Sequence, residues 1–190
     1  MSLFQMRYVR MTTGTALFLC LAGCSPMSAA VSGAKVSMKV FTGAQAKVYP
    51  LEGLSPDAVR PYQSVALGQV TTDVDPICPF DVLSEVRSAL AEAFADEQLR
   101  RLFPGGKPQL VANVVVRFFK QGSPFGKEPR LDMLVSFVDG TDGREIGRVY
   151  VEGISESPLE TKARHLAAAN AEELGTLLRN RKQMLLEKVK

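Results

Sequence analysis

Few residues of this chain have the types and spacing that nucleophilic, acid–base or metal chemistry requires. The 190 residues include one histidine, His165, and three cysteines, at positions 20, 24 and 78. A structural zinc site takes four His or Cys ligands, and no second histidine or cysteine lies near His165. A Ser-His-Asp set would have to use His165, and the sequence holds no Gly-x-Ser-x-Gly elbow. We therefore interpret His165 as a surface or boundary residue and expect no enzymatic activity, no metal and no cofactor.

Two glycine-containing segments share features with ligand-binding loops. Gly122 to Lys127 is one residue short of a phosphate loop, contains a proline and lacks the Ser or Thr after its lysine. Asp139 to Gly143 lacks the closing glutamate of a calcium loop, and its Asp-Gly pairs favour a hairpin turn. We interpret both segments as strand connections. In the first, Phe125 lies at the tip, where it either anchors a partner or folds back onto the sheet edge.

The N-terminal segment has the layout of a secretory signal peptide. Arg7 and Arg10 precede an apolar run over residues 11–21, and small residues follow up to Gly23. A membrane-spanning helix needs about 20 apolar residues, so this run is too short to span. We predict that residues 1–23 form a signal peptide, cleaved between Gly23 and Cys24. The alternative is a buried N-terminal helix or strand.

The sequence Leu21-Ala22-Gly23-Cys24 resembles the lipobox of bacterial lipoproteins. That resemblance implies that the thiol of Cys24 is acylated and that the mature chain begins there. One acyl chain gives only reversible membrane attachment, whereas the three chains that the resemblance implies hold a protein permanently. Ser25, in place of aspartate, implies the outer membrane, with the folded part on the periplasmic face. The alternative is an ordinary signal peptide that is followed by a chance cysteine.

The composition of the remaining chain narrows its partners. Without residues 1–23 the chain has 21 basic and 20 acidic residues, a net charge of +1 without basic runs, which argues against nucleic acid. Cys20 leaves with the signal peptide and Cys24 carries lipid, so Cys78 has no partner for an intramolecular disulfide. We interpret Cys78 as a small buried apolar residue. Residues 24–34 are small and polar and predict a lipidated flexible tether, followed by one domain over residues 35–190.

The hydrophobic periodicity of that domain predicts strands and two helices. Alternation along residues 131–138 directs Leu131 and Met133 inward and Asp132 outward. The segment 43–60 reads as irregular, and Asn170 interrupts the apolar stripe of the last helix. The expected strands are 35–41, 64–70, 110–119, 131–138 and 145–154, and the expected helices are 79–99 and 157–186. This order predicts an α+β two-layer sandwich, a mostly antiparallel sheet of about 4–5 strands with two helices on one face, the C-terminal one long. The alternative is a long helix that projects to a partner.

Part of this pattern resembles a group of small uncharacterised bacterial lipoproteins, similar in layout to the amino-terminal domain of TolB and to anticodon-binding-like α/β sandwiches. The segments that carry the resemblance are 62–70, 82–90, 114–122 and 135–140. The resemblance implies a non-enzymatic envelope lipoprotein that acts as an adaptor or assembly factor and docks on a periplasmic partner. The alternative function is a carrier of lipid or another small ligand, or an auxiliary component of an envelope transport system. A carrier would need an apolar cavity between the sheet and the long helix.

Overall fold

The computed structural model describes residues 43–74, 78–122, 128–155 and 162–187. The predicted signal peptide, Cys24, the tether, the predicted strand 35–41 and Phe125 lie outside the described residues. Within the described ranges, no helix combines the length and the apolar composition that crossing a membrane requires.

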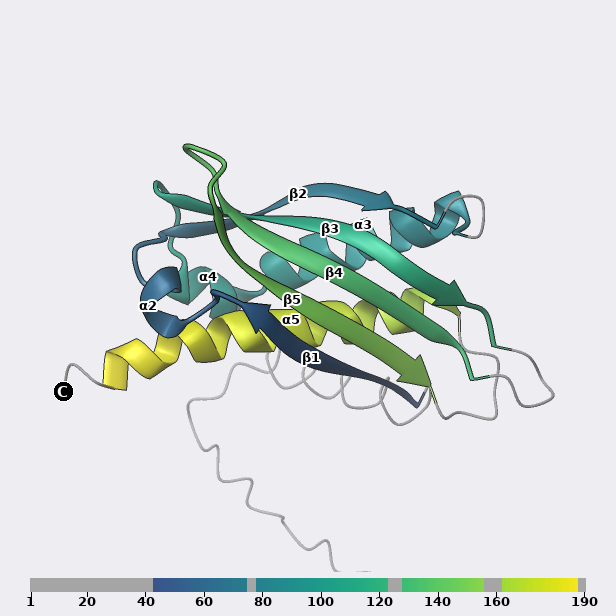
Figure 1. The fold of residues 1–190 in the computed structure, drawn as a ribbon. Coiled ribbons are helices and arrows are strands. Elements are labelled where there is room, and N and C mark those ends of the chain that lie inside the picture. Colours follow the sequence, from purple (N-terminus) through teal and green to yellow (C-terminus); the bar gives the residue numbers. More distant parts are fainter. Residues whose placement is uncertain (1–42, 75–77, 123–127, 156–161, 188–190) are drawn as a thin grey trace, which may run out of the picture.

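Five strands form one open sheet in the spatial order β1-β5-β4-β3-β2 (Figure 1). The three contacts among β1, β5, β4 and β3 are antiparallel, and β2 runs parallel to β3. The strands are β1 (Ala44–Glu52), β2 (Ser64–Thr72), β3 (Gln109–Lys120), β4 (Arg130–Asp139) and β5 (Glu145–Ser155). The predicted α+β fold with a mostly antiparallel sheet is confirmed.

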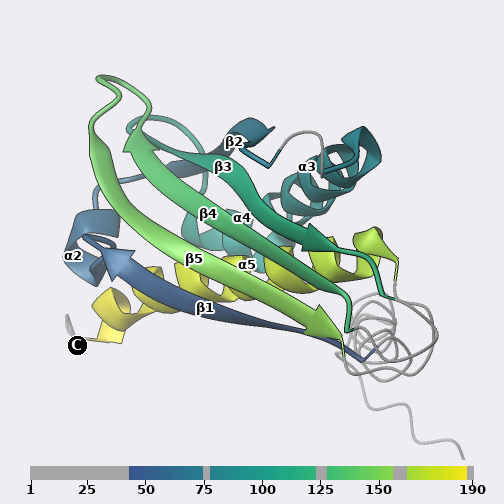
Figure 2. The ribbon, with the colours of Figure 1, turned by 45° about the vertical axis from the view of Figure 1, so that its right-hand side comes forward.

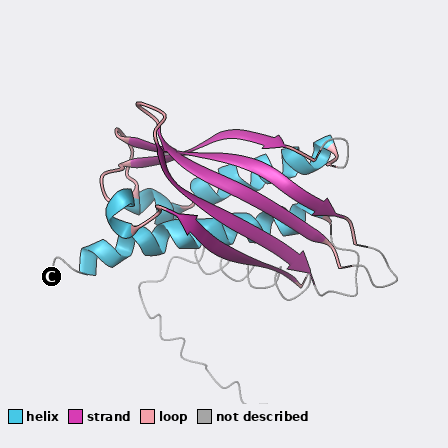
Figure 3. Cartoon of the chain, in the orientation of Figure 1, coloured by secondary structure: helices cyan, strands magenta, loops and turns pink. Residues whose placement is uncertain are grey.

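Helices pack on one face of this sheet (Figures 2 and 3). Because a tight turn cannot join the parallel strands β2 and β3, the chain crosses between them through helix α3 (Phe80–Phe94). The long C-terminal helix α5 (Ala163–Glu187) lies beside α3 and contacts β1, β5 and β4. The described residues also form two short helices, α2 (Pro56–Val59) and α4 (Glu97–Leu102). The alternative of a long helix projecting from the sheet is therefore wrong, because α5 packs across it.

The core lies between the sheet and these helices. The predicted alternation is confirmed on β4, on β5 and on β3 as far as Val116, where every second side chain is buried, but Phe118, which the pattern places on the buried face of β3, is exposed. Burial of such a side chain contributes about 1.5–3 kcal/mol. Cys78 is also buried, as predicted. Fully buried apolar side chains include Val86, Leu90, Leu110, Val116, Leu131, Met133, Val135, Phe137, Val149, Val151, Leu166, Leu174 and Leu178.

The helix predicted over residues 79–99 is interrupted in the structure. Helix α3 ends at Phe94, and the side chain of Asp96 then accepts the backbone N–H groups of Gln98 (3.0 Å) and Leu99 (3.4 Å). An aspartate in this position caps a new helix, so the chain restarts as α4. The prediction of a single helix is wrong because this cap competes with continuation.

The prediction that residues 43–60 are irregular is wrong for the part that forms strand β1. The segment contains Pro50, and proline usually interrupts a strand. Proline is tolerated on an outer strand, where one ladder hydrogen bond can be missing, and β1 is the outer strand beside β5. Tyr49 and Leu51 of this strand are exposed large hydrophobic residues.

A cluster around Tyr62 fastens the end of α5 to the segment before β2. The ammonium of Lys182 donates to the backbone carbonyls of Arg60 (2.8 Å) and Tyr62 (2.6 Å). The same ammonium lies 5.0 Å from the centre of the Phe103 ring, within cation–π range. The hydroxyl of the buried Tyr62 donates to Asp139 at 2.9 Å. These contacts connect the last turns of α5 to the segment that precedes β2.

Ionisation of the Tyr62 hydroxyl is expected to lower the stability of the protein at alkaline pH. Burial, together with the hydrogen bond to Asp139, raises the pKa of Tyr62 from 10.0 to about 12. A group whose pKa is raised by folding stabilises the protein fully below its unfolded pKa, and this contribution is lost as the pH rises through the folded pKa. We expect the free energy of unfolding to fall between about pH 10 and pH 12 and the Tyr62→Phe variant to lose less over that range. Urea denaturation at several pH values measures both slopes, and an unchanged slope in Tyr62→Phe would contradict the assignment.

Candidate functional site

The sheet face opposite the helices is not covered by any element of the described residues, and we call it the open face (Figure 2). Strand pairing brings Val111 next to Val138 and Val115 next to Leu134 on this face. These four side chains are half-buried, neither enclosed in the core nor fully solvated. A solvated sheet face usually carries polar side chains, so this apolar group distinguishes the open face from an ordinary surface.

A buried carboxylate lies on the same face. Asp132 points outward from β4, as the alternation predicts, yet it is only 2% exposed because Arg130 and Tyr150 cover it. Arg130 Nε donates to both carboxylate oxygens at 2.9 Å, and its Nη2 lies 2.7 Å from Oδ2. The Tyr150 hydroxyl donates to Oδ2 at 2.7 Å. A buried carboxylate persists in its charged form only when it is paired in this way.

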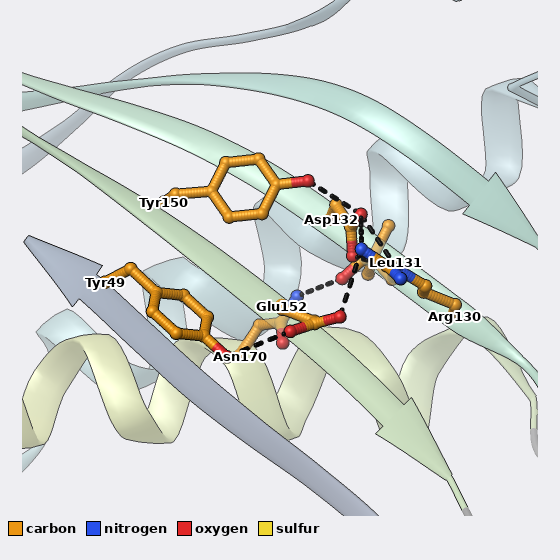
Figure 4. Close-up of polar contacts among 7 residues, drawn as sticks. All are labelled: Tyr49, Arg130, Leu131, Asp132, Tyr150, Glu152 and Asn170. Atoms are coloured by element: carbon orange, nitrogen blue, oxygen red, sulfur yellow. Dashed lines mark hydrogen bonds and ion pairs between the residues drawn. The ribbon is translucent and has the colours of Figure 1, made fainter. Parts of the chain in front are cut away.

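A second carboxylate extends these contacts across three strands (Figure 4). Glu152 on β5 accepts from Arg130 Nη2 at 3.0 Å and from the Tyr49 hydroxyl on β1 at 3.1 Å. We call Tyr49, Arg130, Asp132, Tyr150 and Glu152 the tyrosine–carboxylate network. Hydrogen bonds between charged partners are about twice as strong as neutral ones, so the network holds its side chains in one arrangement.

The electrostatics of the network favour fixed charges over proton transfer. The hydrogen bond to Asp132 and the nearby carboxylates raise the pKa of Arg130 further, so the guanidinium stays cationic. Burial and the bond to Asp132 raise the pKa of Tyr150, and the bond to Glu152 raises the pKa of Tyr49. Both hydroxyls therefore remain protonated at neutral pH and act as donors. General acid–base catalysis works best with a pKa near the operating pH, so this arrangement suits recognition better than proton transfer.

A pocket of about 580 Å³ opens beside the network. This volume lies within the range of about 300–1,000 Å³ that is typical of ligand sites. The guanidinium of Arg130 lies 5.6 Å from the centre of the Phe118 ring, so the pocket combines a cation, carboxylates and aromatic surface. Its lining residues are Phe118, Lys120, Glu128, Arg130, Asp132, Tyr150, Glu152 and Ile154.

A β-bulge places Phe118 in this pocket. The pairing of β3 with β4 shifts by one residue between Val116 and Phe118. Val116 opposes Met133 on the core side, and after the shift Phe118 opposes Asp132 on the open face. A regular strand would have directed residue 118 into the core, because side chains alternate with a period of two.

Asn170 supports the network from the core side. It is fully buried on α5, and its Nδ2 donates to the backbone carbonyl of Leu131 at 2.9 Å. Its Oδ1 has no hydrogen-bond partner among the described residues and lies against Gly153 of β5. This contact explains why the apolar stripe of the helix is interrupted at position 170. It fixes α5 to β4 directly behind Arg130 and Asp132 (Figure 4).

The residues singled out in the sequence have different outcomes. Gly23, Cys24 and Phe125 lie outside the described residues, so their roles stay predictions. His165 is half-buried at the edge of α5 and accepts from Arg164 Nε at 3.3 Å, which confirms a boundary position. Burial and neighbouring cations lower the pKa of His165. In the part of the chain that the structure describes, no three His, Cys, Asp or Glu side chains gather as a metal site would require.

The turn over residues 139–143 is a hairpin turn, as predicted. The backbone N–H of Asp139 donates to the carbonyl of Arg144 at 2.8 Å, and Gly143 adopts a φ of 73°. The positive φ is a conformation that glycine adopts without steric cost.

The sequence interpretation did not identify the tyrosine–carboxylate network. The available signal was a pair of outward charges, Arg130 and Asp132, two positions apart on one face of a mostly apolar strand. The pocket also differs from the cavity that the carrier alternative requires. It lies on the open face, whereas packed side chains such as Leu166 and Leu174 occupy the space under α5.

Comparisons with known proteins match this chain to solved structures of low identity and to no family. No family model and no curated protein matches the chain. Among solved structures, the PelC dodecamer from Paraburkholderia phytofirmans has 11% identity and a TM-score of 0.43, covering 72% of this chain and 97% of that one.

Two further solved structures are similar. A candidate lipoprotein from Caulobacter crescentus has 13% identity and a TM-score of 0.42, covering 67% of this chain and 96% of that one. A Xanthomonas campestris protein of the DUF330 family has 13% identity and a TM-score of 0.41, covering 72% and 97%. At these identities and TM-scores the solved structures assign no function to this chain, and the resemblance to TolB stays a prediction.

Proposed function

We propose that this chain is a lipid-anchored, non-enzymatic protein of the bacterial cell envelope that docks on a periplasmic protein through the open face. The observation that carries the proposal is the open face itself, where half-buried Val111, Val115, Leu134 and Val138 lie beside an ordered polar network. The pair Asn113–Ser136 lies between the two apolar pairs. Apolar surface that is bordered by polar groups is typical of protein–protein interaction sites.

The chemistry of the open face favours a protein over other partners. Interfaces are enriched in tyrosine and arginine, and their binding energy is concentrated in a few such residues that lie in well-packed surroundings. Tyr49, Tyr150 and Arg130 meet this description, and the carboxylates already hold them in position. Less rotational freedom is then lost when a partner binds.

The anchor part of the proposal is supported by the sequence. The basic start, the short apolar run and Gly23-Cys24 match a lipoprotein precursor, and Ser25 favours the outer membrane with the domain in the periplasm. About ten flexible residues span roughly 17–18 Å on average, which lets the domain tilt while it stays near the membrane. Mass spectrometry of the purified chain tests this part. Acylated Cys24 at the new N-terminus is expected, and an uncut precursor or an unmodified Cys24 would overturn the anchor.

Site-specific photo-cross-linking in cells tests the docking. A photoreactive residue at Leu134 or Val138 probes the open face, and one at the exposed Arg87 on α3 is the matched control on the opposite layer. We expect one defined cross-linked protein from the open-face positions, none from position 87, and a strong reduction when Cys24→Ser removes the anchor. Identical cross-links from all three positions, or none from the open face, would refute docking through this face.

A further inference from the structure

We infer that the pocket beside the tyrosine–carboxylate network receives a basic side chain, arginine or lysine, from the docking partner. This inference rests on the proposed docking function and specifies its chemistry. Three independent properties of the pocket support it: its charge, its hydrogen-bonding groups and its aromatic surface.

The lining of the pocket has more carboxylates than cations. Asp132 and Arg130 neutralise each other through two-point pairing. Glu152 shares the same guanidinium, and Glu128 and the exposed Lys120 complete the charged lining, so three carboxylates stand against two cations. A cation that enters the pocket would restore the balance. A pocket whose lining has a net negative charge also attracts cations from solution.

The neighbouring strand supplies a competitor for the same position. Lys47 on β1 is exposed and lies opposite Glu152 in the strand register. Its ammonium can approach Glu152 from solvent, so it is expected to weaken the binding of an incoming cation. Removal of the Lys47 charge should therefore strengthen the binding of the incoming cation, whereas removal of the Glu152 charge should weaken it.

Two of the three donor side chains of the pocket, Arg130 and Tyr150, are already bonded within the network, whereas its carboxylates keep acceptor positions. An ionised carboxylate has about four acceptor positions and no donor. The described contacts of Glu152 use two of them, for Arg130 and Tyr49, and its side chain is 23% exposed. A ligand that fits must bring donors. A guanidinium brings five in a planar fork and an ammonium brings three.

The aromatic surface favours the same kind of ligand. Phe118 is 41% exposed at the pocket, and the ring of Tyr150 forms part of the wall. Cations are attracted to the faces of such rings, and the apolar stem of arginine or lysine can pack on Ile154. A neutral aromatic ligand would use the rings but would leave the carboxylates without new partners.

A titration observed by NMR tests the inference directly. The full chain is prepared in neutral detergent micelles with labelled isoleucine methyl groups and titrated with N-acetylargininamide. Ile154 lines the pocket, and Ile146 near the opposite end of β5 is the internal reference. N-acetylcitrullinamide has the same shape without the charge. We expect saturable shifts of Ile154 with the arginine probe and about tenfold weaker binding of the citrulline probe, as loss of one charge-assisted hydrogen bond predicts.

Matched variants assign the effect to the pocket. We expect Glu152→Gln to weaken the arginine probe about tenfold, and Glu145→Gln, at the other end of β5, to leave it unchanged. Lys47→Gln should bind the probe about twofold to threefold more tightly. Equal binding of both probes, an unmoved Ile154, or full affinity in a Glu152→Gln variant with a native spectrum would each overturn the inference.

The outcome is separable from that of the proposed function. Specific cross-linking from the open face together with no response to the arginine probe would leave docking in place and refute the basic side chain. A response to the probe without an envelope partner would refute docking and leave the pocket chemistry in place.

Discussion

Replacement of Gly153 by alanine is expected to lower the free energy of unfolding by roughly 2–3 kcal/mol, in the range for an overpacked core. A Cβ atom on Gly153 would overlap the side-chain amide of Asn170. Neither group can move freely, because Gly153 lies within β5 and Asn170 is fully buried and bonded to the Leu131 carbonyl. Urea denaturation of the two proteins measures the difference.

A double-mutant cycle identifies the cause of this loss. Asn170→Ala should by itself cost about 1–2 kcal/mol, because it removes the hydrogen bond to Leu131. In that background Gly153→Ala should cost little, since the overlapping amide is gone. The control is Gly175→Ala on α5, where an added Cβ meets nothing within 4 Å and stability should stay equal or rise by up to about 1 kcal/mol. Additive effects of the two core substitutions would contradict the proposed contact.

The Arg130→Met variant is expected to lose about 3 kcal/mol of stability, the lower end of the range for breaking a buried ion pair. Methionine retains much of the apolar stem, so the main change is the loss of the charge. The carboxylate of Asp132, whose side chain is 3% exposed, would then remain buried with the Tyr150 hydroxyl as its described donor. The exposed fraction of Arg130 itself, 41%, matters less, because the uncompensated group is the aspartate.

Arg148→Met is the matched control for this prediction. Arg148 lies on the neighbouring strand and also pairs with two carboxylates, Glu52 and Glu145, each at 2.8 Å. Both of these carboxylates are exposed, so their loss of a partner is compensated by water and the cost should stay below about 1 kcal/mol. Chemical denaturation of the two variants gives the comparison. Equal losses would show that the burial of Asp132 has no energetic consequence.

Most of the fold could be predicted from the sequence, because periodicity reports which side of a strand or helix is apolar. Apolar and polar residues alternate clearly along strands β3, β4 and β5. Each observed bound of these strands lies within one residue of the predicted bound. Where a local signal competes with periodicity, the sequence does not show which of the two determines the structure. Asp96 ends one helix and begins another, and Pro50 lies inside a strand because that strand is the outer one.

The candidate site could not be predicted, because it depends on contacts between strands that are far apart in sequence. Arg130 and Asp132 are neighbours on β4, but Tyr49 and Tyr150 reach them only through the order β1-β5-β4. The bulge after Val116 also reverses the direction of Phe118. A one-residue shift of this kind leaves no trace in the hydrophobic pattern, since both Phe118 and Phe119 are apolar. The sequence shows Asn170 as an interruption of the apolar stripe, but the reason for it, the contact with Gly153, lies on another element.

The attachment of Lys182 to the carbonyls of Arg60 and Tyr62 has a consequence for folding kinetics. These residues are separated by 120 or more positions in the sequence. Contacts of such long sequence separation require the closure of a large loop, so we expect this attachment to form after the folding transition state. Its loss would then raise the unfolding rate and leave the folding rate nearly unchanged.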